Sequence, residues 1–365
     1  MKLKRLGVPV ALLAAAALSL TACAANEASA PASTSAKPSN LSGTLNGIGS
    51  SAQGAAQTVW IAGFQQANPK ATVNYDPQGS GAGRKSFIAG AADFAGSDAA
   101  LNATELASTF AGCAAGSKTI DLPVYISPIA IAYNLDGVKD LKLDAATIAG
   151  IFSGKITTWD DAKIKGLNAD ASLPSAPITV VHRSDDSGTT QNFTDYLAAN
   201  APEVWTAPAS QTFPFQIGDA AKGTSGVADT TKNAKNSITY IDESGSAGLS
   251  IAQLKVGDGF EKISADGAAA VVAASPIADG RGSNDDLAVK INRKDTAKGA
   301  WPLVLVSYVI ACQEYKDSAK ADLVKGYVDY LVSGDAQKAA AKQAGSAPLA
   351  SDLSDKVSKA VASIK

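Results

Sequence analysis

Side chains suited to binding an anion are concentrated in one stretch of the chain, residues 183–190, which reads RSDDSGTT. The β-branched run before it, Ile178 to Val181, predicts a strand, and the i, i+3, i+4 spacing of Phe193, Tyr196 and Leu197 predicts a helix after it. A turn between strand and helix leaves the first backbone N–H groups of the helix unpaired, at the positive end of its dipole. With the hydroxyls and the guanidinium of the turn, these donors predict an anion-binding site. An ordinary N-cap, made by a serine or aspartate of the turn, is the alternative for this stretch alone.

Two further turns have the same construction of strand, small hydroxyl-bearing turn and helix. They are centred on Ser51 and Ser80, and the second is rich in glycine. A short predicted strand, Asp93 to Ala95, leads to Asp98. In open α/β sheets, ligands bind beyond the carboxyl ends of the strands. Three such turns, with Arg183 and Asp98 at strand ends, therefore predict one shared oxyanion site.

The chemistry of this predicted site suits phosphate. Arg183 can donate in a bidentate fork, and Asp185 can hold its guanidinium in one orientation. Asp98 can accept the proton of monoprotonated phosphate, and it would reject sulfate, because a buried carboxylate facing an anion is costly without a proton between them. A helix cap or a salt bridge is the alternative for Asp98. Arg84, at the mouth of the glycine turn, is interpreted as a solvated surface residue, and attraction of anions into the site is the alternative for it. The other predicted donors are the hydroxyls of Ser80, Ser187 and Thr189 and the backbone N–H groups of Ser51, Ala52 and Gly188.

The motifs of common enzymes are missing from the chain. It contains neither the Gly-x-Ser-x-Gly elbow of α/β-hydrolases nor a Gly-x-x-x-x-Gly-Lys-[Ser/Thr] phosphate loop. Its one histidine, His182, directly precedes Arg183, so along a strand the two side chains point in opposite directions. One histidine and no thiol cluster also argue against a His/Cys metal site. We therefore expect a binding protein with no cofactor, no metal and no catalytic residue.

Length and composition set the class of protein. The 365 residues suggest two domains, and 46% hydrophobic with 18% charged residues is ordinary for a globular chain. A formal net charge of −2 gives no reason to expect nucleic-acid binding or a basic membrane-binding patch. Short apolar strands alternate with helices from Ser42 onward, which predicts an α/β fold with largely parallel sheets. The anion site must therefore be built from a few local groups.

The N-terminus has the pattern of an export signal. Residues 1–22 combine a basic start with a nearly continuous apolar run, Val8 to Leu20, which is short for a membrane span. The run ends in Leu-Thr-Ala-Cys, similar to a bacterial lipobox, so we expect Cys23 to be the first mature residue and to be acylated. A plain secretory signal is the alternative. Residues 23–41 are poor in large apolar residues and are predicted to be a disordered tether.

Two cysteines remain after Cys23. In an exported protein the pair Cys113 and Cys312 predicts a disulfide, and two buried free thiols are the alternative. Two long β-rich runs, Leu122 to Tyr133 and Trp301 to Ala311, are candidate crossings between two lobes.

Three other segments have weaker secondary-structure patterns. Ala145 to Phe152 predicts a helix, residues 202–226 are expected to be irregular, and Ala319 to Lys365 is predicted to be helical.

The three turns and the segment that leads to Asp98 resemble the substrate-binding lipoprotein of the bacterial phosphate-specific (Pst) ABC transporter. Residues 183–190 resemble the Arg-x-Asp-x-Ser-Gly-Thr loop of that family, and Gly79–Gly81 followed by Asp93–Asp98 resembles a second signature. The first family loop reads Gly-Ala-Thr-Phe, whereas residues 49–52 read GSSA, so that Ser51 stands for the threonine and Ala52 for the phenylalanine. Weaker similarities lie at residues 154–161, 263–267 and 300–302.

The resemblance implies a two-lobed periplasmic-binding-protein-like fold of type II, with lobes joined by two crossing strands. Lobe I would combine residues 42–124 and 302–365, with both remaining cysteines in it, and lobe II would be residues 125–301. It also implies a monomer, lipid-anchored on the outer face of the cell membrane, that binds inorganic phosphate and delivers it to the transmembrane subunits and ATPase of an ABC permease. The phosphate contacts it implies are Ser51, Ala52, Ser80, Asp98, Arg183, Ser187, Gly188 and Thr189.

Three alternatives stay open. The first is a binder of another tetrahedral oxyanion such as sulfate or molybdate, the second a secreted phosphatase on the same fold, and the third a surface protein that has lost binding. The proton-accepting role of Asp98 distinguishes the first, turnover of a phosphomonoester the second, and an absence of any ligand the third.

Overall fold

The structure is a computed structural model that describes residues 41–365, and these belong to one compact unit, Pro38–Lys365. The predicted signal, the predicted lipidation site Cys23 and all but the last residue of the predicted tether lie outside the described residues. No helix within the described part is both long and apolar enough to cross a membrane.

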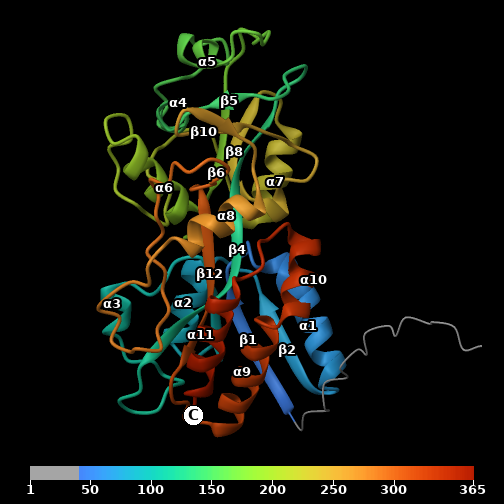
Figure 1. The fold of residues 1–365 in the computed structure, drawn as a ribbon, viewed down its shortest axis with the longest axis vertical. Coiled ribbons are helices and arrows are strands. Elements are labelled where there is room, and N and C mark those ends of the chain that lie inside the picture. The colour runs from blue at the N-terminus through green and yellow to red at the C-terminus, as the bar shows by residue number, and fades with distance from the viewer. Residues whose placement is uncertain (1–40) are drawn as a thin grey trace, which may run out of the picture. The chain divides into compact units, whose positions relative to one another are not determined.

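Figure 1 shows the arrangement of the strands and helices. The strands form two sheets, one of nine strands and one of three. The strands of the larger sheet are β1 (Ser42–Gly49), β2 (Lys70–Asp76), β3 (Phe94–Ser97), β4 (Thr119–Asn134), β6 (Thr179–Arg183), β7 (Asp219–Ala221), β8 (Ser237–Asp242), β9 (Ser250–Ile251) and β12 (Val304–Cys312). The smaller sheet contains β5 (Lys142–Leu143), β10 (Gln253–Val256) and β11 (Gly259–Glu261).

Helices connect most of these strands. They are α1 (Gly54–Ala67), α2 (Ser80–Ile88), α3 (Ala103–Leu106), α4 (Ala145–Phe152), α5 (Ala162–Leu167), α6 (Gly188–Asn200), α7 (Gly223–Asn233), the 3-10 helix η1 (Glu243–Gly245), α8 (Ala265–Ala273), α9 (Ser318–Leu331), α10 (Gly334–Ala344) and α11 (Ser351–Ala362). The mixed α/β class predicted from the sequence is confirmed.

The larger sheet has the order β2-β1-β3-β12-β4-β8-β6-β7, with β9 beside β4. Its two ends are parallel, since β1 pairs in parallel with β2 and β3, and β6 pairs in parallel with β7 and β8. The middle is antiparallel, because β12 and β4 run against each other and against their outer neighbours. The expectation of largely parallel sheets therefore holds for the two ends and fails in the middle.

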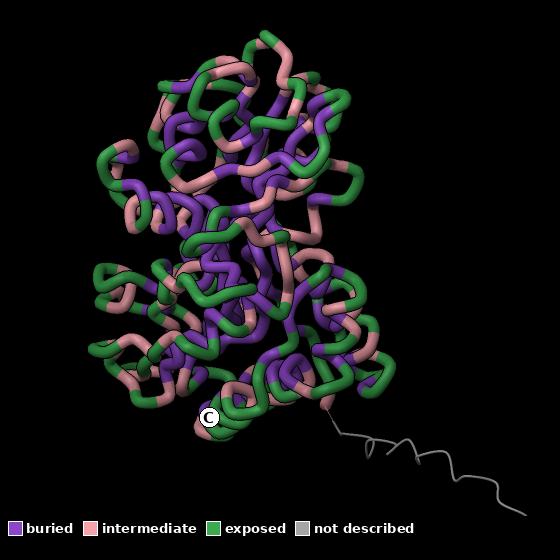
Figure 2. Tube along the Cα trace, turned by 45° about the horizontal axis from the view of Figure 1, so that its top comes forward, coloured by how far each residue is buried: buried purple, intermediate pink, exposed green. Residues whose placement is uncertain are grey.

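Strand β4 belongs to both halves of this sheet. Its residues 119–128 pair with β12, and its residues 129–134 pair with β8. Every residue of β12 and all but the last residue of β4 are buried, and the buried chain is purple in Figure 2. Both predicted long β runs are therefore central strands, and continuous burial explains why they read as apolar runs without alternation.

One prediction from the sequence is wrong in part, and another is confirmed. The segment expected to be irregular contains the edge strand β7 and the start of α7. A strand of three residues, two of them exposed, is too short to show a hydrophobic period. The C-terminal region is helical as predicted, and it consists of the three helices α9, α10 and α11. Ser333 caps the start of α10, and Gly345 ends it in the left-handed conformation at φ +67°.

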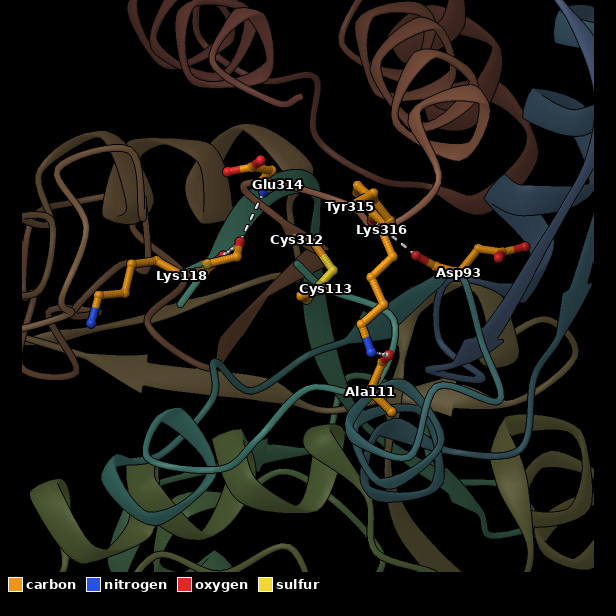
Figure 3. The surroundings of a disulfide bond; sticks show 9 residues. Asp93, Ala111, Cys113, Lys118, Cys312, Glu314, Tyr315 and Lys316 are labelled. Carbon is orange, nitrogen blue, oxygen red and sulfur yellow. Dashed lines mark hydrogen bonds between the residues drawn. A yellow bond between two sulfur atoms is a disulfide. The ribbon is translucent and has the colours of Figure 1, made fainter. Parts of the chain in front are cut away.

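The two remaining cysteines are joined, as predicted. Cys113 and Cys312 form a disulfide with their Cα atoms 5.4 Å apart, next to the end of β12 (Figure 3). The same two segments are also held by Lys316 Nζ donating to the Ala111 carbonyl at 2.8 Å and by the Ala114 N–H donating to the Glu314 carbonyl at 2.8 Å. The bridge therefore ties the segment before β4 to the segment after β12.

Replacing both cysteines with serine should lower the free energy of unfolding by about 2–5 kcal/mol, because the 199-residue separation makes a long loop in the unfolded chain. The hydrogen bonds around Ala111 and Glu314 should preserve the folded geometry. Denaturant unfolding of the oxidised protein and of the double variant measures the difference. An unchanged midpoint in the double variant would contradict the expected contribution.

Candidate functional site

Four strand-turn-helix units meet in one place. The Gly81 N–H donates to the Asp186 carbonyl at 3.0 Å, which joins the turn before α2 to the turn before α6. Ser51 Oγ lies 3.1 Å from Thr224 Oγ1, which joins the turn before α1 to the start of α7. The structure therefore brings together the three turns predicted from the sequence and adds a fourth, at α7.

The contact between two of these turns requires glycine. A Cβ atom added to Gly188 would lie 2.6 Å from both Ser80 Oγ and Asp98 Cβ, closer than real side chains approach. Gly188 therefore lets the start of α6 pack directly against Ser80 and Asp98.

Unused donors gather at these helix starts. Within residues 41–365, the backbone N–H groups of Ser51, Ser80, Gly188 and Thr189 have no hydrogen-bond partner. The Ala52 N–H instead donates to Ser50 Oγ at 3.1 Å, so the donor predicted at Ala52 is already occupied. Four free N–H groups at helix starts are the arrangement that binds an anion.

Asp98 is buried at the centre of this arrangement, with 3% of its surface exposed. Its Oδ1 accepts from Ser50 Oγ and Ser307 Oγ, each at 2.5 Å, and its Oδ2 accepts longer bonds from Ser80 Oγ at 3.3 Å and Thr189 Oγ1 at 3.4 Å. Neither a helix cap nor a salt bridge, the two alternatives for this residue, is formed among the described residues.

The surroundings of Asp98 act on its pKa in both directions, with a net rise. Burial raises its pKa, whereas the hydroxyls of Ser307 and Ser50 and the charge of Arg183 act in the opposite direction without cancelling the rise. Because its hydrogen bonds are the longer ones, Oδ2 is the oxygen that can share a proton with a ligand.

Arg183 is held as predicted. Its Nε donates to Asp185 Oδ1 at 2.7 Å and its Nη2 donates to Asp185 Oδ2 at 2.5 Å, with only 5% of Arg183 exposed. Burial opposes the charge of Asp185, but the hydrogen bonds and charge of Arg183 outweigh it and lower the pKa of Asp185. The Gly223 N–H adds a third donor to Asp185 at 3.1 Å. Asp185 therefore stays ionised and fixes the plane of the guanidinium.

A small cavity lies beside this arginine. It has about 170 Å³ of empty space, none of it wide enough in this state to hold a water molecule. Its lining residues are Arg183, Thr189, Thr224, Val227, Tyr240, Ile241 and Asp242.

Ser187 has the ordinary capping role that was the alternative for this turn. Its Oγ accepts the Thr190 N–H at 3.2 Å, and its side chain is fully buried. The cap and the anion site are compatible, because the cap uses the Thr190 N–H and leaves those of Gly188 and Thr189 unpaired.

Arg84 was interpreted as a solvated surface residue, and this is wrong. Only 2% of it is exposed, and its guanidinium donates to Glu105 Oε1 and Ser97 Oγ at 2.9 Å and to Gln211 Oε1 at 2.6 Å. The charge is tolerated inside the protein because Glu105 neutralises it. A glutamate on the next helix in the sequence was the signal for this pairing.

His182 takes no part in the site. Its two ring nitrogens lie 3.0 Å from the carbonyl oxygens of Arg183 and Ile217, and its ring stacks on Phe213. No group of three or more acidic, histidine or cysteine side chains in the described part of the chain is arranged to hold a metal ion.

Four residues of the site were missed by the sequence analysis: Ser50, Thr224, Asp242 and Ser307. Ser307 is a buried serine inside a largely apolar strand, and Asp242 is an acid at the end of a strand, as Asp98 is. Both patterns were visible. Thr224 was hidden because its strand and helix were expected to be irregular.

This chain is similar to a family of binding domains and to several phosphate-binding proteins. A family model described as a PBP superfamily domain matches residues 27–335. Phosphate-binding protein PstS 3 of Mycobacterium tuberculosis is 35% identical over 381 residues, and PstS2 of Mycobacterium bovis is 36% identical over 374 residues, with 100% of both chains covered in each case. A solved structure of a high-affinity periplasmic phosphate-binding protein, PfluDING, bound with phosphate, superposes with a TM-score of 0.70. It is 23% identical, and the match covers 86% of this chain and 93% of that one, which supports the fold.

Proposed function

Because this chain belongs to the PstS family of phosphate-binding proteins, within the PBP superfamily, we propose that it binds inorganic phosphate outside the cytoplasm and passes it to an ABC permease. The observation that carries the proposal is Asp98, a buried carboxylate among unpaired N–H groups and a fixed arginine. An anion site that contains a carboxylate favours an anion that brings a proton, which monoprotonated phosphate does and sulfate does not.

The proposed ligand contacts divide into donors and one acceptor. Arg183 and the hydroxyls of Ser80 and Thr189 donate, together with the N–H groups of Ser51, Ser80, Gly188 and Thr189. Asp98 accepts the phosphate proton through Oδ2. Ser187 contributes by capping α6, and Ala52 by packing in the core.

Release of phosphate requires this site to open. We propose that residues 42–124 with 302–365 form one lobe and residues 125–301 the other. Contacts between them include Lys85 Nζ with Asp186 Oδ2 at 2.7 Å and Lys222 Nζ with Gln78 Oε1 at 2.6 Å, both on exposed side chains. Exposed pairs of this kind contribute little each. Most of the cost of opening therefore lies in the contacts around the site, such as the hydrogen bond from the Gly81 N–H to the Asp186 carbonyl.

The remaining parts of the proposal concern the cell. Cys23 carries the lipid that holds the protein to the outer face of the membrane, residues 24–41 act as its tether, and the protein works as a monomer. It binds without turnover, since its one histidine is held by the Ile217 and Arg183 carbonyls, away from Asp98.

Titration calorimetry on the full-length protein in detergent tests the binding function. The protein is unfolded, dialysed free of carried-over ligand, refolded, and titrated with phosphate and with sulfate. One-to-one binding of phosphate without binding of sulfate is the expected result. Equal binding of both anions would remove the role given to Asp98, and no heat from a folded sample would contradict the proposed function. Release of phosphate from p-nitrophenyl phosphate would instead support the phosphatase alternative.

A further inference from the structure

We propose that Asp242 is a second carboxylate of the anion site, and that a proton on Asp242 reverses a hydrogen-bond relay through Thr224 and so frees the Ser51 hydroxyl to donate to phosphate. This inference rests on the proposed function and assigns the proton dependence of the same site. Asp242 acts through Thr224 and Ser51 and is therefore a positioning residue.

The relay is a line of three side chains from three different elements. Asp242, fully buried at the end of β8, accepts from Thr224 Oγ1 through Oδ1 at 3.3 Å. Thr224 Oγ1 lies 3.1 Å from Ser51 Oγ, which also accepts the Thr224 N–H at 3.1 Å. Asp242 and Thr224 both line the small cavity beside Arg183. The line therefore connects a buried acid to a turn of the anion site.

Counting protons fixes the direction of the relay. Each hydroxyl has one proton to donate, and an ionised carboxylate can only accept. With Asp242 ionised, Thr224 donates to Asp242 and must accept from Ser51, so the Ser51 proton is used inside the protein. With a proton from solvent on Asp242 Oδ1, Asp242 donates to Thr224, Thr224 donates to Ser51, and the Ser51 proton is free for a bound anion.

The partners of the other oxygen place the proton on Oδ1. Asp242 Oδ2 accepts from Ser244 Oγ at 2.8 Å, from the Ser244 N–H at 3.3 Å and from Tyr125 OH at 3.5 Å. A backbone N–H only donates, so Oδ2 remains an acceptor in both states. The oxygen that faces Thr224 is the one whose role changes.

The charges around Asp242 make both states accessible near neutral pH. Burial raises the pKa of Asp242 to about 7, hydrogen bonds from Ser244 and Thr224 act against this rise, and the negative charge of Asp98 adds to it. Arg183 and Tyr240 face Asp242 across the cavity, and Tyr125 contacts it from β4. A phosphate dianion bound near Arg183 would bring further negative charge toward Asp242 and so favour its protonated form.

The site then contains two carboxylates, Asp98 and Asp242, whereas the ligand brings only one proton. Monoprotonated phosphate supplies a proton to Asp98, so Asp242 must take its proton from solvent. Above the pKa of Asp242, phosphate binding should therefore take up one proton, and the apparent affinity should fall as pH rises.

The test compares the full-length wild-type protein with the Asp242→Asn variant, titrated with phosphate from pH 6 to pH 9. Asparagine stays neutral and keeps an N–H that can donate to Thr224. Because the ionisation of phosphate itself is common to both proteins, the ratio of their Kd values isolates Asp242. The wild-type Kd should rise relative to the variant by about tenfold per pH unit above the pKa of Asp242. At pH 8, calorimetry in two buffers of different ionisation heat should show about one more proton taken up by the wild type.

The Ser244→Ala variant provides a second readout that a purely structural role would not move. Removing the Ser244 hydroxyl takes a donor from the ionised carboxylate, so the pH at which affinity begins to fall should move upward. Thermal unfolding at each pH verifies that every variant is folded. If Asp242→Asn fails to fold, the Ser244→Ala shift decides the matter alone.

Each outcome has a distinct meaning. Parallel pH profiles of wild type and Asp242→Asn, or an unshifted Ser244→Ala profile, would overturn the relay while the proposed function stands. A folded wild type that binds no phosphate at any pH would overturn the proposed function and the relay together.

Discussion

Replacing Arg183 with alanine should weaken phosphate binding by about 30- to 5,000-fold, since truncating one member of a buried, hydrogen-bonded charge pair costs about 2–5 kcal/mol. The variant loses the guanidinium beside the cavity and leaves Asp185 buried without its partner. Arg183→Lys keeps the charge but loses the planar fork, so it should recover only part of the affinity. Titration calorimetry with phosphate measures both.

A partly buried, ion-paired arginine outside the site provides the control. Arg281 is paired with Asp121 and Asp286 and also donates to the Leu101 carbonyl, outside the cavity beside Arg183. Arg281→Lys should lower the free energy of unfolding and leave phosphate affinity unchanged. If both arginine variants weakened phosphate binding equally, the effect would be one of general stability, and Arg183 would have no special role.

Asp98→Asn should remove most of the discrimination between phosphate and sulfate. In the wild type a fully ionised anion meets a carboxylate with no proton between them, and a site built to bond a ligand hydroxyl rejects an analogue lacking it by about 10⁴-fold or more. An asparagine amide can keep the hydroxyls of Ser50 and Ser307 on its oxygen and turn an N–H toward the ligand. Phosphate affinity should fall while sulfate becomes a ligand. Competition titrations with the two anions measure the ratio of affinities.

Asp185→Asn is the control for this experiment. That carboxylate lies next to the site but is turned toward Arg183 and the Gly223 N–H. Its loss should weaken both anions together and leave their ratio unchanged. A selectivity change of the same size in both variants would contradict the assignment of the proton-accepting role to Asp98.

Local sequence patterns predicted the parts of the site that depend on neighbours in the chain. The turns at Ser51, Ser80 and Ser187 were identifiable because strand, small residues and helix follow each other directly, and Asp185 is two residues from the arginine it orients. The crossing strands were identifiable because complete burial makes them apolar without interruption.

The parts that were missed depend on contacts distant in the sequence. Ser307 reaches Asp98 across 209 residues, and Thr224 reaches Ser51 across 173. Nothing in the residues around Ser307 says that its strand inserts beside β3, because that neighbour is set by the topology of the sheet. Arg84 is a mixed case, because its partner Gln211 lies 127 residues away whereas its partner Glu105 lies on the next helix in the sequence.

The position of β12 between β3 and β4 has a consequence for the order in which the protein forms. Strands β1 to β3 are made first, yet their sheet lacks its inner neighbour until residues 304–312 have been synthesised. Contacts between residues so far apart in the sequence form slowly, because the entropy of closing the loop is lost before the new contacts can compensate for it. Biosynthesis therefore leaves the early strands without a finished core until almost the whole chain is available, and a protein truncated before β12 should fail in its N-terminal half.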